Sequence, residues 1–145
     1  MWHEDTDERK RIGEQMQDLF QKSVRCSCGG KFKFIGDLQA GFPDFTCDYC
    51  GQLVDVKSSP QAERTGNLSV SAIPWNNYPD DVLLVTRIKG RWLGEFKRNI
   101  ATINAKANEP THKSQHESLK NTQWFLISWR VFSELETLGY GITNL

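Results

Sequence analysis

Four cysteines form the densest group of potential metal ligands in the chain. They lie in two pairs, Cys26-x-Cys28 and Cys47-x-x-Cys50, and a glycine follows each pair. Two such turns can wrap four thiolates around one tetrahedral Zn²⁺, and four thiolates leave no open position for catalysis. Glycine after the second cysteine permits positive φ, so backbone N–H groups can point at the sulfurs. The pattern predicts a structural zinc site rather than two disulfides, because the polar, acidic N-terminus offers no secretory context.

Two aspartates and a lysine flank the second cysteine pair. Asp44 precedes it, and the triplet Asp55-Val56-Lys57 follows it. If residues 52–57 form a strand, Asp55 and Lys57 project from one face, and a hairpin partner at 43–47 would bring Asp44 near Asp55. Two converging carboxylates suit Mg²⁺. A nearby lysine can orient or help deprotonate a water held against a phosphodiester, so the spacing predicts metal-assisted phosphodiester hydrolysis.

The same residues resemble the signature of the PD-(D/E)XK nuclease superfamily, with Pro43-Asp44 followed by Asp55-x-Lys57. The likeness, over about residues 26–59, is closest to the zinc-containing nuclease domain of methyl-directed restriction endonucleases that cut GATC sites. There, too, a cysteine pair precedes an Asp-aromatic-x-Cys-x-x-Cys stretch, and an acidic-x-Lys-Ser follows. The chain differs in that we expect no segment for a separate winged-helix domain, so methyl-specific recognition is not carried over.

The resemblance implies a Mg²⁺-dependent DNA endonuclease with a structural zinc beside its active site. It implies that Asp44, Asp55 and the main-chain carbonyl of Val56 bind the catalytic Mg²⁺, and that Lys57 assists the nucleophilic water. The zinc ligands would be Cys26, Cys28, Cys47 and Cys50. Many superfamily members add an acid from the first helix. Here Glu14 is expected to face solvent and Glu8 to lie nearer the buried edge, and neither is assigned.

Two alternatives stay open. Pro79-Asp80 followed by Glu95-Phe96-Lys97 also satisfies the loose pattern. We favour the first copy because the cysteine turn constrains the geometry between its two halves. The second alternative is a non-catalytic zinc-ribbon module that binds nucleic acid or a protein partner. In that module Asp44 and Asp55 are ordinary surface carboxylates.

The elements that must position these side chains follow from hydrophobic periodicity. A helix is expected at residues 5–22, where Ile12, Met16, Leu19 and Phe20 share a face. A second helix is expected from about 118 to 138, where Phe125, Trp129 and Phe132 form a stripe closed by Gly139. Strand-like segments lie at residues 31–35, 42–46, 52–57, 82–88 and 91–96, with a short element at 68–73.

These elements predict one α+β domain over residues 1–145, with a zinc-binding insertion at about 26–51. The core is expected to be an α/β/α-like, restriction-endonuclease-like mixed β-sheet flanked by helices, with an embedded, zinc-ribbon-like site of four cysteines. The aromatic C-terminal helix is one surface through which a homodimer could form to cut both strands.

Charge and hydropathy limit the kinds of partner that the chain is expected to have. The 145 residues carry 18 basic and 18 acidic side chains, which argues against coating nucleic acid by bulk electrostatics. Residues 87–120 nevertheless hold eight basic and three acidic side chains, enough for a track along phosphates. No apolar run approaches the roughly 18–20 residues that span a bilayer. We therefore expect a cytoplasmic protein whose partner is DNA, bound with strong salt dependence, and no membrane.

Overall fold

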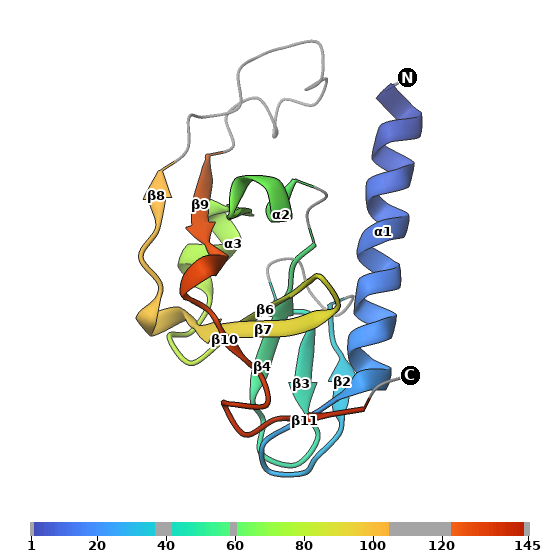
Figure 1. Cartoon of the computed structure of the whole chain (residues 1–145), viewed down its shortest axis with the longest axis vertical. Coiled ribbons are helices and arrows are strands. Elements are labelled where there is room, and N and C mark those ends of the chain that lie inside the picture. The colour runs from blue at the N-terminus through green and yellow to red at the C-terminus, as the bar shows by residue number, and fades with distance from the viewer. Residues whose placement is uncertain (1, 37–41, 59–60, 105–122, 144–145) are drawn as a thin grey trace.

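The computed structural model describes residues 2–36, 42–58, 61–104 and 123–143 (Figure 1). Within them, no helix is both long enough and apolar enough to cross a membrane. The helical elements are α1 (Trp2–Ser23), α2 (Ala62–Thr65), α3 (Ala72–Asn77) and the 3-10 turns η1 (Lys97–Asn99) and η2 (Trp129–Val131). The strands are β1 (Val24–Arg25), β2 (Phe32–Phe34), β3 (Phe45–Cys47), β4 (Leu53–Val56), β5 (Asn67–Ser71), β6 (Leu83–Ile88), β7 (Arg91–Phe96), β8 (Ile103–Asn104), β9 (Trp124–Ser128), β10 (Ser133–Glu134) and β11 (Gly141–Ile142).

A six-stranded mixed sheet is the centre of the fold. Its strand order is β10-β7-β6-β4-β3-β2, and every neighbouring pair is antiparallel except β4 with β6, which is parallel. A three-stranded antiparallel sheet, β5-β9-β8, and the short pair β1-β11 complete the strands. The α+β class and the mixed sheet expected from the sequence are therefore confirmed.

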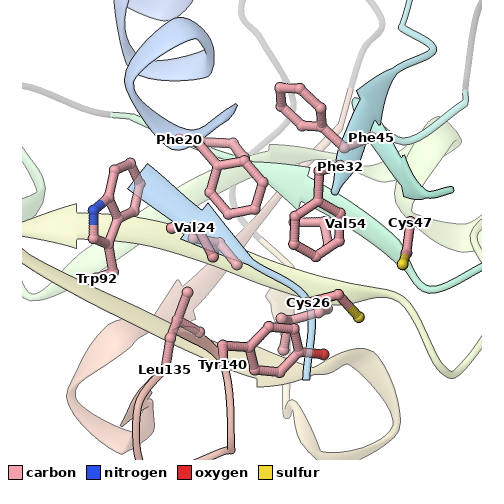
Figure 2. Packing of buried hydrophobic residues seen from close by; sticks show 13 residues of the cluster. Phe20, Val24, Cys26, Phe32, Phe45, Cys47, Val54, Trp92, Leu135 and Tyr140 are labelled. Atoms are coloured by element: carbon pink, nitrogen blue, oxygen red, sulfur yellow. The ribbon is translucent and has the colours of Figure 1, made fainter. Parts of the chain in front are cut away.

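Helix α1 packs its apolar stripe on the central sheet (Figure 2). The Phe20 ring lies 5.2 Å from that of Phe32, 5.0 Å from Phe45 and 5.6 Å from Trp92, measured between centroids. Phe20 is fully buried, and burying a side chain of that size contributes about 2–3 kcal/mol. This cluster holds α1 against β2 and β3, the two strands that border the cysteine pairs.

Strand β6 is buried on both faces of the sheet. Leu83 and Val85 belong to the cluster under α1, whereas Leu84 belongs to a second cluster formed with α2, α3 and the β5-β9-β8 sheet. A strand buried on both faces is expected to be apolar throughout rather than alternating, as the Val82–Val85 run is. The central sheet therefore lies between two packed layers.

Most of the predicted elements are present. The expected helix at 5–22 lies within α1, the segments at 31–35 and 52–57 contain β2 and β4, and the segment at 42–46 overlaps β3. The 82–96 hairpin is formed by β6 and β7, with Lys89 and Gly90 both at positive φ (52° and 78°). Positive φ at both central residues is the conformation that a type I′ turn requires.

The predicted C-terminal helix is wrong. Residues 124–128 form β9, which pairs along its full length with β5, and 129–131 and 133–134 form η2 and β10. The part of the prediction at 118–122 lies outside the described residues. Phe125, Trp129 and Phe132 do pack on one cluster, but from a strand and a turn. Aromatic and β-branched residues favour strands wherever a partner strand is available, and helical spacing over so few residues does not exclude that outcome.

Candidate metal centre and carboxylate site

The four cysteines converge at one end of the β2–β3 hairpin. Their sulfur atoms all lie within 4.8 Å of one another, with Cys26 Sγ 3.5 Å from Cys50 Sγ and Cys28 Sγ 3.4 Å from Cys47 Sγ. A tetrahedron with Zn–S bonds of about 2.3 Å has sulfur–sulfur edges of about 3.8 Å. The four thiols, none of them in a disulfide, therefore form a cluster able to hold a metal ion.

Glycines give the two cysteine turns their shape. Gly29 and Gly51, which follow the pairs, have φ of +91° and +82°, as the sequence predicted. Gly30 is needed for another reason, because a Cβ there would lie 2.6 Å from Cys47 Sγ. Main-chain N–H groups of Tyr49 and Cys50 donate to Cys47 Sγ at 3.4 and 3.5 Å. The backbone thus supplies hydrogen bonds to sulfur of the kind that stabilise thiolates at a metal.

The environment favours the thiolate at Cys47. Burial raises its pKa, but the N–H groups of Cys50 and Tyr49 more than offset that effect and lower the pKa to about 7. Burial instead raises the pKa of Cys26 to about 12. A metal ion would have to displace the proton of Cys26, so its binding is expected to be coupled to proton release.

Asp44 links three elements at the start of β3. Its Oδ2 accepts the main-chain N–H of Val56 at 2.8 Å, and its Oδ1 accepts the side-chain amide of Gln17 from α1 at 3.1 Å. Burial raises the pKa of Asp44, while the Val56 N–H and the positive charge of Lys57 counter that shift. The Val56 contact confirms that β3 and β4 bring Asp44 to the Asp55 segment, as the proposed hairpin predicted.

Asp55 is a buried carboxyl group, 3% exposed, on β4. The Tyr78 hydroxyl lies 3.5 Å from its Oδ1. Its Oδ2 has no hydrogen-bond partner among the described residues, and Lys57 Nζ lies 3.9 Å from that atom. Burial raises the pKa of Asp55 to about 7; Lys57 lowers it, and the neighbouring Asp44 raises it further. The structure therefore brings Asp44, Asp55 and Lys57 together around one buried oxygen that accepts no hydrogen bond from the described residues and has the Lys57 ammonium as its ion-pair partner.

A cavity of about 470 Å³ borders Asp44. Its lining residues come from α1 and from the segment around β2, and they are Lys10, Gly13, Glu14, Gln17, Phe34, Gly36 and Asp44. Glu14 is exposed, as expected, yet it borders the same cavity as Asp44. The reason is that the cavity lies along the flank of α1, so a residue far from the buried stripe still reaches it.

The second copy of the pattern does not form a comparable site. Glu95 Oε1 accepts the N–H of Phe96 at 2.8 Å and the side-chain amide of Asn99 at 3.1 Å. Lys97 Nζ donates to the Tyr78 carbonyl at 2.5 Å and lies 5.6 Å from the centroid of the Trp75 ring. In the described part of the chain, no hydrogen bond or ion pair joins the exposed Asp80 to Glu95. Lys97 instead fixes the segment from which Tyr78 reaches Asp55.

Gln17 and Tyr78 are site residues that sequence reasoning missed. Gln17 lies one turn after Glu14 on the same face of α1, and it is Gln17 whose side-chain amide donates to Asp44. Tyr78 follows α3, and nothing in its local sequence indicates that it approaches β4. The packing of Tyr78 against Trp75, with ring centroids 6.1 Å apart, and the hydrogen bond from Lys97 to the Tyr78 carbonyl place its hydroxyl there.

Within the described residues, arginines of the predicted basic track contact neighbouring side chains. Arg91 Nε donates to Glu134 Oε1 at 2.6 Å, and the guanidinium groups of Arg87 and Arg98 lie over the rings of Trp92 and Phe96. Lys89 lies in the β6–β7 turn, and the lysines at 106, 113 and 120 lie outside the described residues. A phosphate track along 87–120 stays a prediction.

No protein-family model matches the chain, and no curated protein matches it. The likeness of residues 26–59 to PD-(D/E)XK nucleases is therefore carried by its motifs and stays a prediction. Function must be argued from the carboxylate site and the cysteine cluster themselves.

Proposed function

We propose that this chain is a Mg²⁺-dependent DNA endonuclease, on a restriction-endonuclease-like core with a structural zinc. The observation that carries the proposal is the Oδ2 atom of Asp55, a buried carboxylate oxygen with no hydrogen-bond partner among the described residues. A buried carboxylate without a full set of partners is costly. A divalent cation would offset that cost, and a second carboxyl group and a lysine already border the position.

The donor set fits Mg²⁺. This ion prefers carboxylate and carbonyl oxygens and retains several of its waters. Asp44, Asp55 and the main-chain carbonyl of Val56 would hold it. Both oxygens of Asp44 already accept one hydrogen bond each, but a carboxylate offers about four lone-pair sites, so ligation remains available. When bound, Mg²⁺ supplies Lewis-acid polarisation of a phosphoryl oxygen and a lower pKa for bound water.

The chain's own residues orient the reaction. Lys57, with its side chain 36% exposed, can reach both the buried carboxylate and a phosphodiester at the surface, where its ammonium group would orient the attacking water. The Val56 N–H and Gln17 hold Asp44, and the Tyr78 hydroxyl, which can donate to Asp55 or to the Phe42 carbonyl, lies beside Asp55. This arrangement keeps the two carboxylates in place before any substrate binds, which is the preorganisation that phosphoryl-transfer sites depend on.

The cysteine cluster supports the same site from the other end of β3. Asp44 directly precedes this three-residue strand and Cys47 ends it. Zinc bound by Cys26, Cys28, Cys47 and Cys50 would fix the hairpin that presents Asp44 to β4. The zinc is therefore assigned a structural role, and hydrolysis is assigned to the carboxylate site.

A cleavage assay with two sets of variants tests the proposal. Asp55→Asn and Lys57→Ala remove groups of the proposed site, while Asp80→Asn and Glu95→Gln remove the matching groups of the second copy. With plasmid DNA and Mg²⁺, the first pair should lose at least about 100-fold in rate, and the second pair should cut as the unmodified protein does. Equal cutting by all variants, or loss confined to the second pair, would contradict the assignment. No cutting by any protein, with zinc and DNA still bound, would instead favour a zinc-ribbon binding module.

A further inference from the structure

A polar stripe on α1 forms one wall of the cavity beside Asp44. The stripe consists of Lys10, Gly13, Glu14 and Gln17, at spacings of three, four and seven residues, and all four line the cavity. At 100° per residue, its centre lies about 110° around the helix from that of the stripe formed by the partly buried Ile12 and Met16 and the buried Phe20. Helix α1 therefore presents one face to the core and a separate face to the cavity.

Gly13 lies in the middle of this polar stripe. Apart from proline, glycine is the least favourable residue for a helix interior, and packing gives no reason for it here. A Cβ added at Gly13 would meet no atom within 4 Å. Glycine at this position leaves the cavity open toward Asp44, and a larger side chain would occupy that space.

Phe34 and Gly36 line the cavity on the side of β2. A Cβ at Gly36 would lie 2.8 Å from the Phe34 ring and 3.6 Å from Asp44 Oδ1. Both glycines line the cavity, but the Phe34 ring fills the space beside Gly36, so the open space lies at Gly13. The cationic end of the stripe is Lys10, which is exposed.

We propose that this cavity is a groove that seats the sugar-phosphate backbone of the DNA strand to be cut. The inference rests on the proposed function and specifies how that site takes its substrate. From Lys10 to Gln17 the helix rises about 10 Å, the length of roughly three nucleotides of a strand at 3.4 Å each. Lys10 would contact a phosphate, Gln17 would hold Asp44, and Gly13 would let the strand pass between them.

Charge makes this binding dependent on a divalent cation. Glu14 and Asp44 oppose an incoming phosphate, and Lys10 is the cation among the described residues that line the cavity. A divalent ion at Asp44 and Asp55 would reverse that balance. The groove is therefore expected to bind DNA in Ca²⁺ or Mg²⁺ and only weakly without either.

Filling the groove tests the proposal. Gly13→Leu should raise the melting temperature, because leucine is a far better helix former, and it should weaken DNA binding at least about tenfold. Binding is measured by fluorescence anisotropy of a labelled DNA duplex of about two helical turns in Ca²⁺, without any cleavage. An RNA duplex of the same sequence distinguishes the two nucleic acids. The matched control is Gln15→Leu, an exposed position of α1 outside the stripe, which should bind DNA as the unmodified protein does.

Lys10→Ala provides an independent reading should the leucine variant fold poorly. It should weaken binding and lower the slope of log Kd against log salt by about one, because one phosphate contact is lost. Unchanged binding by folded Gly13→Leu, or an unchanged slope for Lys10→Ala, would overturn the groove. Those results would leave the nuclease proposal intact if Asp55→Asn still abolishes cleavage. If nothing cuts DNA but both groove variants weaken binding, the groove stands and the nuclease proposal falls.

Discussion

Replacing Asp55 by asparagine should stabilise the metal-free protein while removing its activity. In the native chain the carboxyl group is buried, its Oδ2 has no hydrogen-bond partner among the described residues, and burial raises its pKa from 3.8 to about 7. Asparagine has nearly the same shape and no charge. The substitution therefore removes the cost of burying a carboxylate, together with the proposed metal ligand.

The size of the effect follows from the shift in pKa. A rise of about three units corresponds to roughly 4 kcal/mol that the ionised group costs the folded state above pH 7. Asparagine brings an amide N–H₂ group that also needs hydrogen-bond partners, and burying this group lowers the gain in folded-state stability by about 1–2 kcal/mol. The net gain for Asp55→Asn at pH 8 is then about 2–3 kcal/mol, or roughly 5–10 °C in melting temperature.

The pH dependence has a definite sign. Below about pH 4 both the folded and the unfolded chain hold the proton on Asp55, so the burial cost is absent. As the pH rises from about 4 to 7, the unfolded chain ionises first and the native protein loses stability. Above about pH 7 the folded chain ionises too and the cost becomes constant. Asp55→Asn should lack this part of the pH dependence.

Urea unfolding of both proteins at several pH values between 5 and 8 measures the difference. The buffer contains no Mg²⁺, and it contains no chelator because a chelator would remove the zinc proposed at the cysteine cluster. Adding Mg²⁺ at pH 8 should stabilise the native protein but not Asp55→Asn, and Asp80→Asn serves as the exposed control. The reasoning is refuted if Asp55→Asn is no more stable than the native protein at pH 8 and shows the same slope with pH.

Three further substitutions have defined outcomes. Tyr78→Phe removes the hydroxyl beside the buried carboxylate. Measured by calorimetry, the Mg²⁺ concentration for half-maximal binding should rise about three- to tenfold. Tyr49 is 82% exposed, so the control variant Tyr49→Phe should leave that concentration unchanged. Cys47→Ala should lower the zinc content from one ion per chain by elemental analysis and reduce the free energy of unfolding by several kcal/mol; full zinc occupancy with unchanged stability would contradict this. Gly94→Ala places a Cβ 2.8 Å from Leu135 Cδ2 and should cost about 1–3 kcal/mol, visible as a lower urea midpoint, while an unchanged midpoint would show that the core yields freely there.

The elements around the cysteine pairs were predictable because local signals agreed there. Glycines after each pair, alternating apolar residues in β2 and β4, and the Lys89-Gly90 turn all indicate the same local structures that the chain adopts. Asp44 approaches Asp55 because the hairpin closes through the cysteine turn, and that closure follows from spacing alone. Where local propensity, turn chemistry and pattern agree, the sequence is a sound guide.

The remaining features depend on contacts that no local pattern encodes. β9 is a strand because β5, more than 50 residues earlier in the chain, pairs with it. Tyr78 reaches Asp55 because Lys97 holds its carbonyl and Trp75 its ring. Periodicity on α1 distinguished the buried face from the rest, but it could not show that a cavity lies along the helix flank. These are tertiary effects, and they override helical spacing and single-residue signals.

The brevity of β3 has a consequence for how this sequence can change over evolutionary time. One strand of three residues joins Asp44 to Cys47, so the carboxylate and the sulfur cluster share a single register. Adding or deleting one residue there would turn the inward side chains outward and displace one centre or the other. Substitution is tolerated more readily, since Tyr49 at the tip of the cysteine turn is almost fully solvent-exposed. We therefore expect insertions and deletions between Asp44 and Cys47 to be less well tolerated than substitutions at exposed positions such as Tyr49.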